Sequence, residues 1–330
     1  MIRFLARRLL WFAATLVAVV TIAFALMRAV PGGPFDGDRE LHPAVERNLR
    51  ARYHLDWPLW KQYLQYVGPL NLDDRGARAL GGDGARPFGG VLAGDLGPSL
   101  RYRDLSVGDV LAASLPSSLA LGIVALFFAL GVGLPAGIAA AAWRGTRADL
   151  ALRLAATLGL ALPNFVIASV LVIVFAFALP WFPVAGHGTW RHLVLPGIAL
   201  GAPFAAYAAR LVRTSMLETL SADHVRTARA LGLPWTSVIL RHALPAALLP
   251  VLSWLGPAAA GILTGSLVIE RLFAIPGAGS HFVLGALNRD YTLAMGVTIL
   301  YTVLVYALNL AVDLAYAAID PRIALGEARR

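Results

Sequence analysis

The sequence predicts an all-α polytopic membrane protein with six transmembrane helices, and three observations lead to this fold class. Hydrophobic residues make up 58% of the 330-residue chain and charged residues only 14%, against about 25% in soluble domains. The mean hydropathy is +0.69. The apolar residues gather in six long stretches, and each is long enough for a helix that crosses the hydrocarbon core, which needs about 20 residues.

The six stretches are predicted spans, and none is interrupted by a cluster of charges. They cover residues 8–30, 114–142, 151–179, 193–216, 246–269 and 292–318. The first stretch follows a basic start and could be taken for a signal peptide, but it exceeds the roughly 7–15 apolar residues of such a peptide. No small-residue cleavage site follows it, which favours an uncleaved first span. In the second span, Gly133 and Gly137 form a small-xxx-small pair that allows close helix packing.

Arginine orients the spans, because cytoplasmic loops are enriched in Lys and Arg. With both termini in the cytoplasm, 14 arginines fall on the inner side and three on the two short outer loops. The inner set is Arg3, Arg7, Arg8, Arg144, Arg147, Arg153, Arg210, Arg213, Arg226, Arg229, Arg241, Arg322, Arg329 and Arg330; the outer set is Arg191, Arg271 and Arg289. We therefore predict that both termini are cytoplasmic.

The segment between the first two spans, residues 31–113, is predicted to be a large polar loop on the outer side. Residues 43–67 have helical periodicity and are expected either on the membrane surface or against the spans. One amphipathic face of this helix is predicted to hold four aromatic residues: Trp57, Trp60, Tyr63 and Tyr66. Residues 70–93 are rich in Gly, Asp and Arg and are typical of a flexible connection. The loop suits two roles, a lip that receives another protein or a cap over helix ends.

A polar, arginine-bearing stretch separates the fourth and fifth spans, SADHVRTARALGLPWTSVILRHALPAALLP at 221–250. Ser221 is expected to cap a first helix. Gly232 suits a left-handed turn that closes this helix, and Pro234 suits the first turn of a second one. Pro245 marks the end of the second helix or a kink. The pattern predicts a rigid helix–Gly–helix elbow, and the plainer alternative is an ordinary amphipathic loop helix.

This elbow resembles the cytoplasmic coupling loop of ABC importer permeases. The family pattern is Glu-Ala-Ala, three residues, Gly, nine residues, Ile, one residue, Leu-Pro. The matching positions here are Arg226-Thr227-Ala228, Gly232, His242 and Leu244-Pro245. Two of the three leading residues and the Ile depart from that pattern, whereas RTARALGL followed by RHAL resembles the peptide-importer branch.

Resemblance to the dipeptide/oligopeptide (peptide/nickel) permease branch extends almost from end to end. The matching segments include RFLARRLLWF, LDWPLWKQYLQYV, GDLGPSL, LPNFVIASVLVIVF, GSLVIERLF, IPGAGS and NLAVDLAYAAIDPRI. In this order they resemble the first of the two membrane subunits, the one with the long outer loop. Residues 70–93 are longer than is usual in the family, which leaves the substrate and its delivery protein open.

The resemblance implies a type I ABC importer permease fold in the bacterial inner membrane. The implied parts are a first transmembrane helix at 1–30, the outer loop at 31–113, a five-helix core at 114–320 with a coupling segment at 217–245, and a cytoplasmic tail at 321–330. The implied partners are a second homologous permease, two ATPase subunits, an extracytoplasmic substrate-binding protein, a peptide cargo and membrane lipid.

The resemblance also assigns roles within the coupling segment. The residues implied to dock on an ATPase are Arg226, Thr227, Ala228, Arg229, Gly232, Leu233, Pro234 and Trp235. The chain has no GxxxxGK[ST] phosphate-binding motif, so we expect no ATPase activity by that route. We accordingly expect no cofactor on this chain, and place ATP and Mg²⁺ in the partner ATPases.

Polar side chains inside spans are costly in a bilayer and are candidates for function by default. Four such residues are candidates for a translocation pathway: Asn164, Glu270, Asn309 and Asp313. Asn309 and Asp313 are four residues apart and therefore share one helix face. Two alternatives stay open, since Asp313 is close enough to the inner interface to face water and Glu270 could form a structural pair with Arg271.

Other classes of function are less well supported. A stand-alone secondary transporter would show inverted repeats, and a membrane-embedded metalloenzyme would show a cluster such as HExxH; the sequence has neither. The absence of cysteine excludes disulfides and thiolate chemistry. The net charge of +9 reflects arginine at span ends and does not indicate nucleic-acid binding. Within the importer class, nickel chelates, glutathione or another small solute remain alternative cargoes.

Overall fold

A computed structural model describes most of the chain as helices. The described residues are 2–29, 42, 44, 47, 48, 50, 54–68, 90–102, 105–263 and 267–319. Within them there is no strand, only an isolated β-bridge between Pro98 and Ser106. The chain divides into two compact units: unit 1 comprises Met1–Pro116 and Gly277–Leu304, and unit 2 comprises Ser117–Pro276 and Val305–Arg330. The long helices α4 and α14 contribute residues to both units.

Five helices of the described part are long and apolar enough to cross a membrane. They are Ala6–Ala29, Val107–Ala142, Arg191–Leu220, Tyr291–Leu314 and Leu249–Leu272, of which the structure describes Leu249–Leu263 and Leu267–Leu272. The predicted third span is not one continuous helix: Arg147–Ala161 and Asn164–Ala178 meet at 108°. Pro163 causes this difference, because proline disfavours helical backbone at the residue before it, and Leu162 is extended. With the bent pair counted as one broken span, the number of candidate spans is six.

Unit 1 is built around the first and last long helices. Its elements are α1 (Ile2–Ala29), α3 (Leu59–Val67), a 3-10 turn (Val91–Ala93), the start of α4 (Val107–Ala142), α13 (Ala278–Leu287) and the first part of α14 (Tyr291–Ile319). A hydrophobic cluster joins α1, α3 and α14 through residues that include Phe24, Tyr66 and Met295. A second cluster joins α4, α13 and α14. Helix α13 begins at Ala278, directly after Gly277 at its N-cap.

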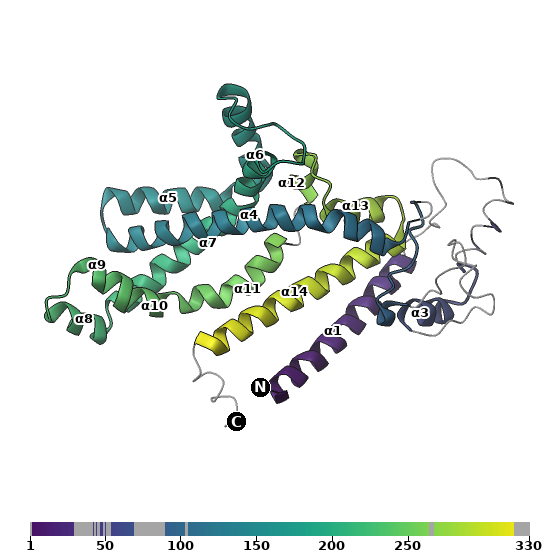
Figure 1. Cartoon of the computed structure of the whole chain (residues 1–330), viewed down its shortest axis with the longest axis horizontal. Helices are drawn as coiled ribbons and strands as arrows, with labels where there is room; N and C mark the ends of the chain where they lie inside the picture. The colour runs from purple at the N-terminus through teal and green to yellow at the C-terminus, as the bar shows by residue number, and fades with distance from the viewer. Residues whose placement is uncertain are drawn as a thin grey trace. The chain divides into compact units, whose positions relative to one another are not determined.

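Helix α3 departs from the aromatic face predicted for residues 43–67. It begins after Pro58 and lies beside the end of α1 (Figure 1). Tyr66 faces the interior, whereas Trp60 is 64% exposed, so the prediction of a shared face is wrong for these two residues. Much of 43–53, and all of 70–93 except the last four residues, lies outside the described residues.

The Asp290 side chain holds residues 99–101, near the end of the predicted outer loop, against the start of α14. Its carboxylate accepts hydrogen bonds from the Ser99 hydroxyl and from the backbone N–H groups of Leu100 at 3.2 Å and Arg101 at 3.3 Å. It also accepts from the Leu293 N–H at 3.1 Å, within the first turn of α14. A single buried carboxylate thus satisfies the backbone of two segments that are distant in sequence.

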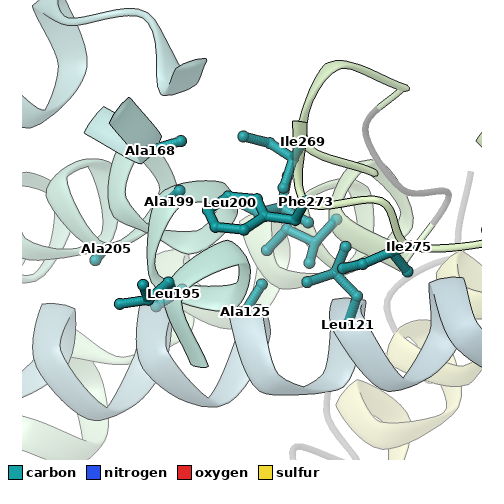
Figure 2. Close-up of a cluster of buried hydrophobic side chains, with 12 residues drawn as sticks. Leu121, Ala125, Ala168, Leu195, Ala199, Leu200, Ala205, Ile269, Phe273 and Ile275 are labelled. Carbon is teal, nitrogen blue, oxygen red and sulfur yellow. The ribbon is translucent and has the colours of Figure 1, made fainter. Parts of the chain in front are cut away.

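Unit 2 contains the remaining helices. They are α5 (Arg147–Ala161), α6 (Asn164–Val172) with a π-helical extension (Ile173–Ala178), α7 (Arg191–Leu220), α8 (Asp223–Ala230), α9 (Trp235–Ser237), a π-helix (Val238–Ala243), α10 (Leu244–Ala247), α11 (Leu249–Leu263) and α12 (Leu267–Leu272). Figure 2 shows the main apolar core of this unit, where the Phe273 ring lies beside Leu200 of α7 and close to Ile269 of α12. Leu121 and Ala125 reach the same core from α4.

Helices α4 and α7 pack closely at two glycines. A Cβ atom on Gly133 would lie 2.6 Å from the carbonyl oxygen of Ala205, and one on Gly137 would lie 2.6 Å from that of Ala209. These separations are too short for any side chain, so the predicted small-xxx-small pair is confirmed as a close contact between helices.

Candidate functional site

The coupling segment predicted at 217–245 folds as the expected elbow. Helix α8 ends before Gly232, whose φ of +76° lies in the left-handed region that favours glycine. Chain direction changes there, and α9 begins after Pro234. No atom lies within 4 Å of the position of a Cβ on Gly232. The predicted left-handed turn is thus confirmed, and its need for glycine comes from backbone conformation and not from crowding.

The first helix of the elbow is not capped as predicted. The Ser221 hydroxyl donates to the Glu218 carbonyl at 2.7 Å, back into the last turn of α7. Helix α8 begins one residue later, with Ala222 at its N-cap and no side-chain cap. The prediction for Ser221 is wrong because this hydroxyl satisfies the end of the preceding helix instead of the start of the next.

The inner face of the elbow is anchored by an apolar cluster. Val225 and Ala228 of α8 and Val238 of the following π-helix are buried. They pack with Val212 and Met216 near the end of α7. Since buried apolar side chains interlock at close-packed density, this cluster fixes α8 against the end of α7.

The opposite face of the elbow exposes an unusual set of residues. Leu231 is 77% exposed, and Leu233 and Trp235 are also exposed. The guanidinium of Arg229 lies 5.2 Å from the centre of the Trp235 ring, within the range of a cation–π contact. The two helices of the elbow lie at the end of unit 2 away from α12 (Figure 1). Leu231 was absent from the predicted docking set, although an apolar residue beside a turn glycine could have indicated it.

The other predicted docking residues occupy distinct positions. Arg226 is exposed and reaches the Asp223 carboxylate at 3.5 Å, while the Thr227 hydroxyl donates to the Asp223 carbonyl at 2.9 Å. Ala228, in contrast, is buried against the cluster that anchors the elbow. This residue is therefore placed to position the elbow, while its charged and aromatic neighbours form the exposed face.

A π-helix precedes Pro245 in the second arm of the elbow. Proline lacks the N–H that an α-helix needs and disrupts the preceding turn. The wider turn at Val238–Ala243 is followed by α10, which has Pro245 in its first turn. The predicted kink at Pro245 therefore takes the form of a π-helical segment rather than a helix end.

A buried ion pair lies in unit 2 between α5 and α7. Asp149, 1% exposed, accepts from the Arg213 guanidinium at 2.8 Å and 2.9 Å. It also accepts from the Gly145 N–H at 3.0 Å and has Arg153 at 3.4 Å. Thr146 caps α5 by accepting from the Asp149 N–H. This brace was not predicted, since the two partners are 64 residues apart in the sequence.

Two of the predicted pathway residues lie in short helices. Asn164 is half-buried as the first residue of α6, directly after the bend at Pro163. Glu270 of α12 is fully buried and accepts from the Ser118 hydroxyl at 2.7 Å. Arg271 is exposed, so Glu270 and its neighbour occupy different environments.

The other two pathway candidates share one face of α14, as their spacing predicted. The Asn309 amide donates to the Val305 carbonyl at 2.9 Å. Its oxygen lies only 2.8 Å from where a Cβ on Gly256 of α11 would be. Asp313 is half-buried one turn further along. Glycine at 256 thus allows the polar side chain of Asn309 to lie directly against α11.

Comparison with known sequences identifies the family. Residues 133–325 match the family described as binding-protein-dependent transport system inner membrane component. The chain belongs to this family. The permease is 44% identical over 325 residues to the oligopeptide transport system permease protein OppB of Escherichia coli (strain K12), covering 98% of this chain and 99% of the relative.

Two further relatives match the permease over the same length. The OppB protein of Haemophilus influenzae is 43% identical, and the dipeptide transport system permease protein DppB of Bacillus subtilis (strain 168) is 41% identical. Each match covers 98% of this chain and 99% of the relative. These alignments include the predicted outer loop as well as the permease core.

A solved structure supports the fold of the permease. An inward-facing conformation of the MetNI methionine ABC transporter superposes with a TM-score of 0.54 at 20% identity. The match covers 64% of this chain and 96% of that chain. The permease therefore has the fold of a type I ABC importer permease, as predicted.

Proposed function

We propose that this permease translocates di- and oligopeptides as one membrane subunit of an ABC importer. The observation that carries the proposal is the 44% identity over 98% of the chain to an oligopeptide transport system permease, joined by 41% to a dipeptide transport system permease. The proposed assembly contains a second homologous permease, two ATPase subunits and an extracytoplasmic substrate-binding protein. We place it in the bacterial inner membrane with both termini in the cytoplasm, which the arginine distribution supports.

In this proposal the exposed face of the elbow docks on an ATPase subunit. The docking residues are Arg226, Thr227, Arg229, Leu233, Pro234 and Trp235, with Leu231 added; Ala228 and Gly232 hold the shape of the elbow. Exposed apolar side chains that gather on a small surface mark a protein contact. Trp and Arg, which are paired here as Arg229 and Trp235, are the residue types that dominate such contacts.

In this proposal, ATP-driven movement of the ATPase subunits reaches the permease through the elbow. ATP and Mg²⁺ are bound by the partner ATPases, and the permease itself holds no cofactor and binds no nucleic acid. Closure of the ATPases moves α8, and the apolar cluster around Val225 and Met216 carries the motion into α7. Transport then follows from a two-state change whose equilibrium is shifted by a ligand at a distant site. Asn164, Glu270, Asn309 and Asp313 are the proposed polar groups of the pathway.

The decisive experiment compares two glycines of the same conformation. Gly232 and Gly94 have φ values of +76° and +79°, and neither has an atom within 4 Å of a Cβ position. Both variants, Gly232→Asp and Gly94→Asp, therefore impose similar backbone strain, but only the first changes the elbow. The tagged permease is purified in mild detergent, the co-purifying subunits are measured by mass spectrometry, and uptake of labelled tripeptide is measured in cells.

We expect wild type and Gly94→Asp to retain ATPase subunits and to import tripeptide, and Gly232→Asp to lose most of both at equal membrane levels. Normal ATPase recovery and uptake by Gly232→Asp would contradict docking through the elbow. Recovery of the ATPases by wild type without tripeptide uptake would instead contradict the peptide cargo while leaving the importer assembly intact.

A further inference from the structure

Helix α3 of unit 1 exposes apolar residues and buries polar ones, the reverse of a helix on the surface of a soluble protein. Its apolar residues Leu59 and Trp60 are 58% and 64% exposed. Its polar residues Gln62 and Gln65 are buried, together with Tyr66. Since a surface helix in water normally buries its apolar face, the exposed face of α3 is suited to an apolar environment.

The buried face of α3 borders a cavity of about 70 Å³. Helices α1 and α14 and the loop segments around residues 54–57 and 98–100 complete its wall. Arg28, in the last turn of α1, contributes the positive charge. Its guanidinium lies 5.4 Å from the Phe24 ring and 5.8 Å from the Tyr291 ring. Aromatic rings therefore flank a guanidinium group that borders the cavity.

Two buried polar atoms on the same wall have no hydrogen-bond partner among the residues that the structure describes. They are Oε1 of Gln62 and the hydroxyl of Tyr66. The orientation of the Gln62 amide follows from its contacts, because Nε2 donates to the Trp57 carbonyl at 2.7 Å; Oε1 is left as an acceptor. Burial raises the pKa of the Tyr66 phenol, with a further contribution from Asp95, so the hydroxyl keeps its proton. Such groups rarely stay unsatisfied in a native protein.

These groups define the chemistry of a ligand. Arg28 requires an anionic oxygen, for which guanidinium has several donors. The Gln62 oxygen requires an N–H or O–H donor, and the Tyr66 hydroxyl can donate to a second anionic oxygen or accept. A phosphodiester whose substituent carries an ammonium or hydroxyl group meets all three requirements.

We propose that the cavity binds the headgroup of a phospholipid such as phosphatidylethanolamine or phosphatidylglycerol. Two observations favour a lipid over a soluble phosphate. Only 11% of the most apolar window of the α1 span is buried within the protein, so most of this helix is available to lipid. Helix α3, which contacts α1, exposes Leu59 and Trp60, and tryptophan is enriched where membrane meets water.

The test is lipid binding to the full-length permease, purified in mild detergent with any subunits that remain bound. Delipidated protein is titrated with phosphatidylethanolamine, phosphatidylglycerol, phosphatidylcholine or inorganic phosphate, and bound molecules are counted by native mass spectrometry. Phosphatidylcholine is the control lipid, because its quaternary ammonium has no N–H to donate to the Gln62 oxygen. The Arg28→Gln and Gln62→Leu variants are compared with Arg101→Gln, which changes an exposed arginine of the same unit.

We expect one tightly held phosphatidylethanolamine or phosphatidylglycerol on wild type and on Arg101→Gln. Arg28→Gln should weaken this binding by about tenfold, the effect of a charged hydrogen bond. Gln62→Leu should reduce the preference over phosphatidylcholine and is informative even if Arg28→Gln fails to fold. Because the readout is lipid binding, it is independent of the proposed transport of peptides.

Three results would overturn the proposal. The first is equal lipid retention by wild type, Arg28→Gln and Gln62→Leu. The second is saturation by inorganic phosphate with no bound lipid, which would indicate a soluble anion as ligand. The third is a photo-crosslink from a benzoylphenylalanine at position 60, in native membranes, that joins a protein and not lipid, since α3 would then be covered by a partner.

Discussion

The Asp149 carboxylate and the Arg213 guanidinium form a two-point ion pair between α5 and α7, with Oδ1–Nε at 2.8 Å and Oδ2–Nη2 at 2.9 Å. Asp149 is 1% exposed. Paired hydrogen bonds between arginine and carboxylate fix geometry as well as supplying energy. The pair therefore sets the position of α5 relative to the helix that carries the elbow.

Removal of the arginine from the Asp149–Arg213 pair should destabilise the permease. Arg213→Met would leave the buried Asp149 charge without its main partner, and we expect a loss of about 3 kcal/mol in the free energy of unfolding. Thermal unfolding of the detergent-purified permease measures this loss. Arg153→Gln is the control, because this arginine is 50% exposed and 3.4 Å from the same carboxylate; its effect should be small. A loss for Arg213→Met no greater than for the control would show that the pair does not brace the helices.

Because α4 contacts α7 at Gly137 but not at Gly131, we expect alanine substitutions at these two positions to differ in their effect on stability. A Cβ on Gly137 would meet the Ala209 carbonyl oxygen at 2.6 Å, whereas one on Gly131 would meet nothing within 4 Å. Gly137→Ala should destabilise the permease by about 1–3 kcal/mol through overpacking. Gly131→Ala should be neutral or stabilising by up to about 1 kcal/mol, because alanine favours helix. Equal melting temperatures for the two variants would contradict the close contact.

The contact between Gly256 and Asn309 predicts a second-site rescue. Gly256→Ala would place a methyl group 2.8 Å from the Asn309 side-chain oxygen, so the variant should unfold at a lower temperature than wild type. Asn309→Ala removes that atom, and the nearest remaining neighbour, Val312, is 3.4 Å away. The double variant should therefore recover much of the lost stability. Additive losses from the two changes would mean that the residues do not touch.

The exposed face of the elbow predicts a loss of assembly without a loss of stability. Trp235→Ala should weaken ATPase binding by about 2 kcal/mol, or about thirtyfold, as expected for a hot-spot tryptophan. Trp190→Ala is the matched control, since Trp190 is also exposed and has Arg191 at 5.7 Å from its ring. Titration of ATPase subunits onto permease in nanodiscs measures both affinities. Equal weakening by the two variants would argue against a specific role for Trp235.

The membrane spans and the turn of the elbow could be predicted from the sequence. The spans could be located from the apolar stretches, because the thickness of the bilayer sets the minimum length of a transmembrane helix. The turn at Gly232 could be predicted because left-handed backbone strongly favours glycine. The bend before Pro163 has a local cause, but the apolar composition of 151–179 favours a continuous helix and does not predict it.

Other features depend on tertiary contacts that a single sequence does not display. The direction of the Ser221 hydroxyl depends on which of two adjacent helix ends it satisfies. The inward face of α3 follows from polar partners such as the Trp57 carbonyl and from the cavity beside it. The Asp149–Arg213 pair joins residues whose separation of 64 positions gives no periodic signal.

The carboxylate of Asp290 has a consequence for biogenesis. It binds the backbone of Leu100 and Arg101 from a position 190 and 189 residues later in the chain. Translation proceeds from the N-terminus, so, in the proposed orientation, the end of the loop before α4 is translocated long before its anchor is synthesised. Those N–H groups must remain hydrated until the last span enters the membrane. Ordering of residues 99–101 is therefore a late event, and a ribosome-stalled chain that ends before Asp290 should leave these residues accessible to protease.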